Sequence, residues 1–224
     1  MGVRVFVLKP HRLSLGGHVG DAMVERGATL VDYVLSEDHT QPSLDGVDAV
    51  LVMGAPWSVY GDEVAPWIDG ALEAIRDAVA RDVPVLGICF GAQAFAHAMC
   101  GRARPADNHE VGWRTVKTTD PATVPEGPWF MWHGDSFDLP PGATAVATTP
   151  IGVQAFTMGP HLCVQFHPEA TPEMIENWLA HSDEDFRRAG IDPAAVLEET
   201  RQREPEAKVR AAALVDRFLS RSAG

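Results

Sequence analysis

The sequence predicts an α/β protein with a flavodoxin-like three-layer fold: a mostly parallel central sheet, an added antiparallel β meander and C-terminal helices. Three observations predict this fold. Short apolar runs alternate with helical patterns in the first half, short strand-like runs broken by Gly and Pro fill the middle, and charged helical segments come last. Strands that alternate with helices are typical of βα units, which place their strands in a parallel sheet.

The parallel strands are expected at apolar runs in the first half of the chain. These are Val3–Leu8, Thr29–Leu35, Val47–Met53 and Val83–Ile88. The last run is almost continuously apolar, as expected for a central strand that is buried on both faces of the sheet.

Helices are expected between and after these strands, near Gly20–Arg26 and at Pro66–Ala80 and Ala92–Met99. In Pro66–Ala80 the apolar residues recur at intervals of three and four, which places them on one face of a helix. They are Ile68, Leu72, Ile75 and Val79.

The meander is expected in the middle of the chain, and further helices follow it. The strand-like runs are Val111–Thr118, Trp129–Trp132, Ala143–Thr148, Val153–Phe156 and Leu162–Phe166. The helical patterns are Glu173–Ala180, Pro193–Gln202 and Glu206–Ser220. No linker or repeat divides the chain, so we expect residues 1–224 to form one domain, with 173–224 as a helical C-terminal extension.

Charge and composition exclude several classes of protein. The formal net charge is −13, from 18 basic and 31 acidic residues, which argues against binding to nucleic acid or to an acidic membrane. No apolar run approaches the length of a membrane span, and the N-terminus lacks the pattern of a signal peptide. The three cysteines include no C-x-x-C pair. We therefore expect a reduced, cytoplasmic, soluble protein.

One cysteine lies in a cramped position, in the segment Gly87-Ile88-Cys89-Phe90-Gly91 between a buried strand and a helix. The segment resembles the G-x-S-x-G nucleophile elbow, with Cys in place of Ser. The helix N-terminus favours a thiolate over a thiol, and the Phe90 N–H could meet a developing oxyanion. The alternative is that Cys89 is a buried apolar side chain, because a G-x-C-x-G pentapeptide also occurs by chance.

A base for this cysteine is available in the segment L-C-V-Q-F-H-P-E-A, where His167 and Glu169 follow an apolar strand. Residues two apart on an extended backbone point to the same side, so Glu169 can hold the imidazole of His167 in one tautomer. In a cysteine-bearing α/β-hydrolase the acid would precede the histidine, which argues against that family.

A third turn, Met53-Gly54-Ala55-Pro56-Trp57-Ser58, also follows an apolar strand directly. It could bring a backbone N–H beside the sulfur. Pro56 has no N–H, so the donor would be Ala55 or Gly54. The alternative is an ordinary turn between a strand and a helix.

Together, a G-A-P turn, G-I-C-F-G-A-Q and Q-F-H-P-E, in this order, resemble the class I glutamine amidotransferase family. The chain is similar to free-standing domains related to the glutaminase half of GMP synthetase, to which E-V-G-W and W-H-G-D-S-F also correspond. The resemblance implies a triad of Cys89, His167 and Glu169 that forms a γ-glutamyl thioester. Where this chain has Ala55, the family usually has Gly, which bears on whether the oxyanion hole is preformed.

The resemblance also implies the remaining site residues. Ala55 and Phe90 would supply the oxyanion-hole N–H groups, and the substrate would be held by Gly54, Gln93, Gly134 and Asp135. His133, in the same W-H-G-D segment, is a candidate to line the pocket. No metal ligands occur at a typical spacing, so we predict no metal and no cofactor.

Three functions follow from these residues. The chain could release ammonia from glutamine for a separate synthetase subunit. It could instead be a stand-alone hydrolase of γ-glutamyl peptides or amines, since the same acyl-enzyme chemistry serves any γ-glutamyl amide. The third alternative is a catalytically silent binding module. The sequence holds no G-x-x-x-x-G-K-[ST] motif for nucleotide binding.

Overall fold

The computed structural model describes residues 2–38, 42–181 and 190–220 and contains one mixed sheet with helices on both faces. The strand order is β2-β1-β3-β4-β9-β8-β7-β5-β6. The strands are β1 (Arg4–Lys9), β2 (Thr29–Val34), β3 (Ala49–Val52), β4 (Val85–Ile88), β5 (Arg102–Thr118), β6 (Gly127–Asp138), β7 (Thr144–Thr149), β8 (Gly152–Met158) and β9 (His161–Val164). The helices are α1 (Gly17–Glu25), α2 (Ile68–Ala80), α3 (Phe90–Ala98), α4 (Pro172–His181) and α6 (Pro193–Ser220).

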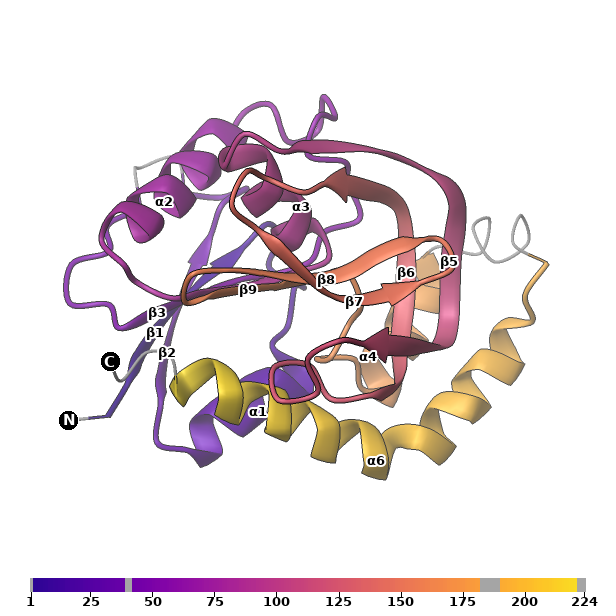
Figure 1. Cartoon of the computed structure of the whole chain (residues 1–224). Coiled ribbons are helices and arrows are strands. Elements are labelled where there is room, and N and C mark those ends of the chain that lie inside the picture. The colour runs from indigo at the N-terminus through magenta and orange to yellow at the C-terminus, as the bar shows by residue number, and fades with distance from the viewer. Residues whose placement is uncertain (1, 39–41, 182–189, 221–224) are drawn as a thin grey trace.

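The sheet has a parallel part and an antiparallel part. Strands β2, β1, β3, β4 and β9 pair in parallel, and β9, β8, β7, β5 and β6 pair antiparallel. Figure 1 shows β7 and β8 beside β9, and the long β5 and β6 curving away from the layer of the sheet. The predicted fold class is therefore confirmed, and β9 joins the two parts.

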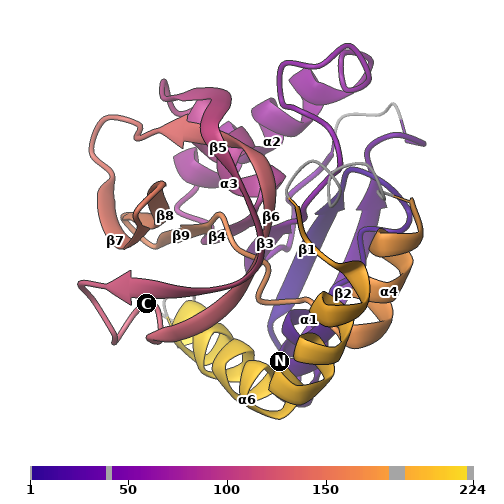
Figure 2. The same ribbon diagram turned by 90° about the vertical axis from the view of Figure 1, so that its right-hand side faces the viewer.

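Alternating side chains of the parallel strands enter two separate cores. Val5 and Val7 of β1 pack with α1 and the end of α6, whereas Phe6 and Leu8 pack with α2 and α3. Figure 2 shows α2 and α3 on one side of the sheet and α1, α4 and α6 on the other. Because a strand covered on both faces must be apolar on both, β3, β4 and β9 are buried at every position.

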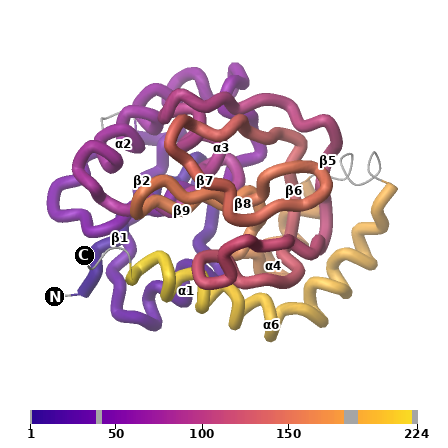
Figure 3. The backbone as a smooth tube through the Cα atoms, in the orientation of Figure 1, coloured from indigo at the N-terminus to yellow at the C-terminus, as the bar shows by residue number. Residues whose placement is uncertain are grey.

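The C-terminal helix differs from the prediction of two helices, because α6 is one helix of 28 residues with Pro205 inside it. A proline removes one backbone hydrogen bond, yet buried residues before and after Pro205 hold both halves. Thr200 accepts a hydrogen bond from the Trp113 indole at 3.0 Å, and Leu214 and Phe218 belong to the core beneath the sheet. Figure 3 follows α6 as it passes beneath α4 and α1.

The predicted extension 173–224 also covers residues 182–189 and 221–224, which lie outside the described residues. Strand β5 begins earlier than predicted, at Arg102, where it already pairs with β6. The first half of this strand is polar and carries no apolar pattern, so the sequence did not indicate it. Within the described ranges, no helix has both the length and the apolar character needed to cross a membrane.

Candidate active site

The predicted elbow is a strained turn between β4 and α3. Cys89 has φ 51° and ψ −108°, and positive φ is unfavourable for a residue with a Cβ. The flanking glycines make room for it. A Cβ on Gly91 would lie 2.2 Å from the Val52 carbonyl oxygen, and one on Gly87 would lie 2.8 Å from the Gly91 oxygen. Only glycine lets the backbone of the elbow approach β3 this closely.

His167 and Glu169 follow β9 and are both buried. The His167 Nδ1 and the Glu169 Oε1 are 2.8 Å apart, so Nδ1–H donates to the carboxylate. The Nε2 atom is buried and makes no hydrogen bond of good geometry to any described residue. Burial opposes protonation of the ring, but the negative charges of Glu169 and Cys89 outweigh it and raise the pKa of His167 well above its usual value.

The ends of β3, β4 and β9 meet at this point. Gly54 follows β3, and a Cβ placed on it would lie 3.3 Å from Cε1 of His167 and 3.6 Å from Cβ of Cys89. The next residue, Ala55, is not among the described non-glycine residues with positive φ, so it does not adopt the left-handed conformation that favours glycine. Ligand sites of parallel sheets lie at these carboxyl ends of the strands.

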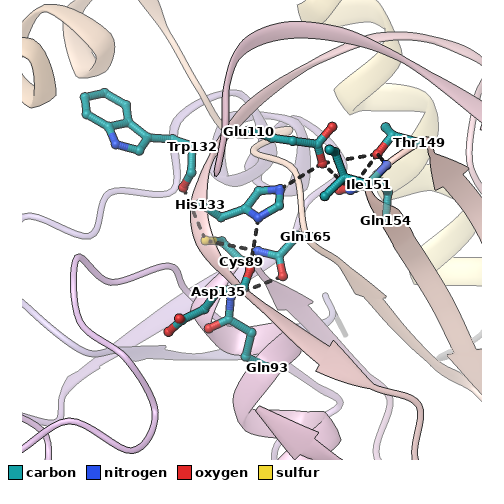
Figure 4. A network of polar contacts seen from close by, with 10 residues as sticks. All are labelled: Cys89, Gln93, Glu110, Trp132, His133, Asp135, Thr149, Ile151, Gln154 and Gln165. Carbon is teal, nitrogen blue, oxygen red and sulfur yellow. Dashed lines mark hydrogen bonds and ion pairs between the residues drawn. The ribbon is translucent and has the colours of Figure 1, made fainter. Parts of the chain in front are cut away.

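A chain of two amide hydrogen bonds also reaches the sulfur. Gln93 Nε2 donates to Gln165 Oε1 at 3.1 Å, and Gln165 Nε2 donates to Cys89 Sγ at 3.5 Å. The Cys89 thiol lies 3.9 Å from the Trp132 carbonyl oxygen. Figure 4 shows both groups directed at the sulfur. The Gln93 amide nitrogen is therefore already engaged inside the protein.

The segment Trp132–Asp135 is held by a buried polar network, which Figure 4 shows. His133 Nδ1 donates to the Asp135 carbonyl oxygen at 2.9 Å, and its Nε2 lies 3.3 Å from the Glu110 carboxylate. Glu110 also accepts from Gln154. The Asp135 carboxylate accepts a hydrogen bond from the Tyr60 hydroxyl at 2.7 Å. The network fixes where the Asp135 side chain enters the site.

These groups surround one pocket of about 600 Å³. It is lined by the predicted site residues Gly54, Ala55, Cys89, Gln93, Gly134, Asp135, His167 and Glu169, and by His133. Phe90 does not line it, because its ring is buried and lies 5.8 Å from Trp67. The backbone N–H of Phe90 is thus the group that could serve the site. Among the described residues, no three His, Cys, Asp or Glu side chains are grouped as metal ligands.

Three further side chains at the site were not singled out from the sequence: Gln165, Tyr60 and Trp178. Gln165 stands two residues before His167, so strand alternation could have placed it beside the triad. Tyr60 reaches Asp135 only through the loop after β3. The Trp178 ring, on α4, lies 5.0 Å from the His167 ring in an edge contact. No local pattern indicates the last two contacts, because they join distant segments.

Comparison with known proteins supports the resemblance. The family model "Glutamine amidotransferase class-I" matches residues 16–181. GMP synthase [glutamine-hydrolyzing] of Psychrobacter arcticus is 34% identical over 138 residues, which are 56% of this chain and 24% of that protein. The same enzyme of Heliobacterium modesticaldum is 30% identical over 201 residues, 76% of this chain and 36% of that protein. The chain thus spans about a third or less of these relatives.

Two solved structures are similar to this protein over almost the whole chain. A glutamine amidotransferase from Thermotoga maritima has a TM-score of 0.88 at 25% identity, covering 98% of this chain and 99% of that one. A glutamine amidotransferase from Methylobacillus flagellatus also has a TM-score of 0.88 at 25% identity, covering 99% and 95%. The chain belongs to the class-I glutamine amidotransferase family.

Proposed function

We propose that this protein hydrolyses a γ-glutamyl amide through a γ-glutamyl thioester on Cys89. The observation that carries the proposal is the oriented imidazole of His167. Its Nδ1 is bound to Glu169, and its Nε2 makes no hydrogen bond of good geometry to a described residue, beside a cysteine on a strained elbow. This is the arrangement that activates a nucleophile by an adjacent, oriented base.

In the first half-reaction, His167 takes the proton of the Cys89 thiol, the sulfur attacks the γ-carbonyl carbon, and the carbonyl oxygen becomes an oxyanion. Backbone N–H groups of Ala55 and Phe90 are proposed to stabilise it. The C–N bond then breaks, and protonated His167 gives its proton to the leaving nitrogen. The products of this step are the thioester and ammonia, or an amine.

In the second half-reaction, a water molecule attacks the thioester carbon while His167 accepts its proton. The C–S bond breaks, glutamate leaves, and the proton returns to the Cys89 sulfur. Glu169 stabilises the imidazolium in both steps and keeps the ring from turning.

We propose that the amino-acid head group of the substrate lies between β6 and α3. The Asp135 carboxylate carries the charge that an ammonium group requires. The oxygen of the Gln93 amide is a second acceptor, since its nitrogen already donates to Gln165. Gly54 and Gly134 line this side of the pocket and offer backbone groups without side-chain bulk.

Two destinations are open for the released nitrogen. The relatives are named GMP synthase, and we propose ammonia transfer to a separate synthetase subunit as one role for this chain. The size of the pocket favours the second candidate, a hydrolase that accepts larger γ-glutamyl compounds. Residues 1–224 are proposed to act as one domain in either case.

The test is glutamate release from glutamine by the purified protein, with Cys89→Ala as the inactive variant and Cys100→Ser as the control at an exposed thiol. We expect turnover in wild type and control alone, and a γ-glutamyl adduct on Cys89 by mass spectrometry after rapid quenching. An adduct on another residue, or unchanged turnover in Cys89→Ala, would contradict the proposal.

A further inference from the structure

The pocket is much larger than glutamine requires. A volume of about 600 Å³ is in the range of sites that bury drug-sized ligands. A second hollow of about 190 Å³ adjoins it and shares five of its lining residues. The shared residues are Leu13, Leu15, Met174, Asn177 and Trp178. The cavity therefore continues past the reacting atoms instead of ending there.

The additional space lies on the side where the leaving group must be. His167 gives its proton to the departing nitrogen, so any substituent on that nitrogen extends over the His167 ring. Trp178 forms the wall at this place, 5.0 Å from the His167 ring and 5.6 Å from the Trp132 ring. The head-group residues Gln93 and Asp135 belong to other elements, α3 and β6. The second hollow borders the Trp178 side only.

The walls of this leaving-group side are apolar and aromatic. Trp132, Trp178 and Met174 line it from β6 and α4, and Leu13 and Leu15 line it from the loop after β1. Leu13 is 56% exposed and Leu15 is 48% exposed, and both line the same hollow as Met174 and Trp178. A contiguous apolar surface of this kind is typical of a ligand-binding groove. An apolar group in the cavity would cover Leu13 and Leu15.

The charged residues that line the cavity restrict which leaving groups it can accept. Among the described residues, neither hollow is lined by Lys or Arg, whereas Asp135 and Glu169 line the first and Glu173 lines the second. His167 already pairs with Glu169, so a carboxylate on the Trp178 side would lie near Glu173 with no described Lys or Arg to pair with, which is costly. A γ-glutamyl peptide carries such a carboxylate on its leaving group, and a γ-glutamyl derivative of a simple amine does not.

We propose that the substrate is a γ-glutamyl amide of an apolar amine, and that the leaving-group side binds the aryl or alkyl part of that amine. The inference rests on the proposed hydrolysis at Cys89 and names its substrate class. Attack by Cys89 breaks the C–N bond, His167 protonates the departing nitrogen, and the free amine leaves. Water then releases glutamate and restores the thiol.

Three compounds test this. They share the γ-glutamyl group and differ only in the leaving group: glutamine, γ-glutamylphenethylamide and γ-glutamylphenylalanine. The last two differ by a single carboxylate. We expect kcat/KM for the phenethylamide to exceed both other values by tenfold or more. A preference for glutamine overturns the inference and leaves Cys89 hydrolysis standing. A preference for γ-glutamylphenylalanine overturns the argument from charge.

Binding gives an answer that does not depend on turnover. Calorimetric titration of the Cys89→Ala protein with the same compounds is expected to show tightest binding of the phenethylamide. Equal affinities would overturn the inference. If the affinities follow the expected order but no compound is hydrolysed by the wild type, the proposed reaction fails while the binding assignment holds.

A substitution at Leu13 tests whether this apolar wall contacts the amine part of the substrate. Leu13→Ala is expected to lower the ratio of kcat/KM for phenethylamide to that for glutamine about threefold or more, because a buried contact with the amine is lost. The matched control is Val209→Ala, which removes an exposed apolar side chain on α6. An unchanged ratio in Leu13→Ala would place the amine elsewhere.

Discussion

The Gln165 amide nitrogen lies 3.5 Å from the Cys89 sulfur, and the oxygen of the same amide accepts a hydrogen bond from Gln93 at 3.1 Å. Gln93 of α3 thus holds Gln165, the residue directly after β9, in contact with the nucleophile. A hydrogen bond to a charged group contributes about 1.5–3 kcal/mol, so the amide stabilises the sulfur when it acts as a nucleophile.

Replacing Gln165 by Met should therefore slow the reaction of the Cys89 sulfur with electrophiles. We expect Gln165→Met to lower the rate of alkylation by iodoacetamide at neutral pH about 10- to 100-fold, since it removes the donor and keeps the volume. The control is Gln202→Met at an exposed position on α6. Equal alkylation rates in the two variants would show that the amide does not act on the sulfur.

Replacing Glu169 by Gln should lower kcat about 10²- to 10⁴-fold, because the imidazole loses the group that orients it and stabilises its charge. The exposed Glu176 on α4 offers a matched control as Glu176→Gln. Steady-state kinetics with glutamine compares the two. Similar losses in both variants would mean that Glu169 has no specific role.

The same substitution has a consequence for pH. Burial acts against protonation of His167, but Glu169 and Cys89 raise its pKa well above the usual value. Because the pKa of His167 is raised in the folded protein, its protonated ring contributes to the free energy of unfolding. This contribution is complete below the pKa of the unfolded chain and is lost as the pH rises through the pKa of the folded protein. NMR titration of the His167 ring should show a lower pKa in Glu169→Gln. An unchanged pKa would contradict the assignment of Glu169 as its cause.

Gly91→Ala and Gly20→Ala should have opposite effects on stability. A Cβ on Gly91 would lie 2.2 Å from a backbone oxygen, so β3 or the elbow must shift, at a cost of about 1–3 kcal/mol. A Cβ on Gly20, inside α1, meets its nearest atom at 3.6 Å and should stabilise the helix by about 0.5–1 kcal/mol. Urea denaturation measures both. Equal midpoints would refute the steric argument.

His161 should make the fold sensitive to acid. Burial lowers the pKa of His161 to about 4, and its Nδ1 accepts a hydrogen bond from the Val85 N–H at 3.2 Å. Between about pH 6.5 and 4, His161 binds a proton more readily in the unfolded chain than in the folded protein. The free energy of unfolding therefore decreases as the pH falls through this range, by about 3 kcal/mol at most. His161→Gln, which keeps an acceptor, should flatten this slope. The exposed His97→Gln is the control, and parallel slopes in the two variants would disprove the role of His161.

The sequence by itself determined the elements, the α/β class and the three motifs of the site. Periodicity and apolar runs depend on neighbours within a few residues, so β1 to β4 and α1 to α3 could be predicted close to their observed bounds. The positions of Cys89, His167 and Glu169 could also be predicted, because Cys89 directly follows β4, the other two lie within a few residues of the end of β9, and parallel strands end at one edge of the sheet.

Only the tertiary structure decided how these motifs are supported. It joined the two predicted helices around Pro205 into α6, because packing on the sheet and on α1 holds both halves of one helix. It placed Gln165 against Cys89, Tyr60 against Asp135 and Trp178 against His167. Contacts of this kind arise where segments far apart in the chain meet, and neither residue of such a pair carries a local signal of its partner.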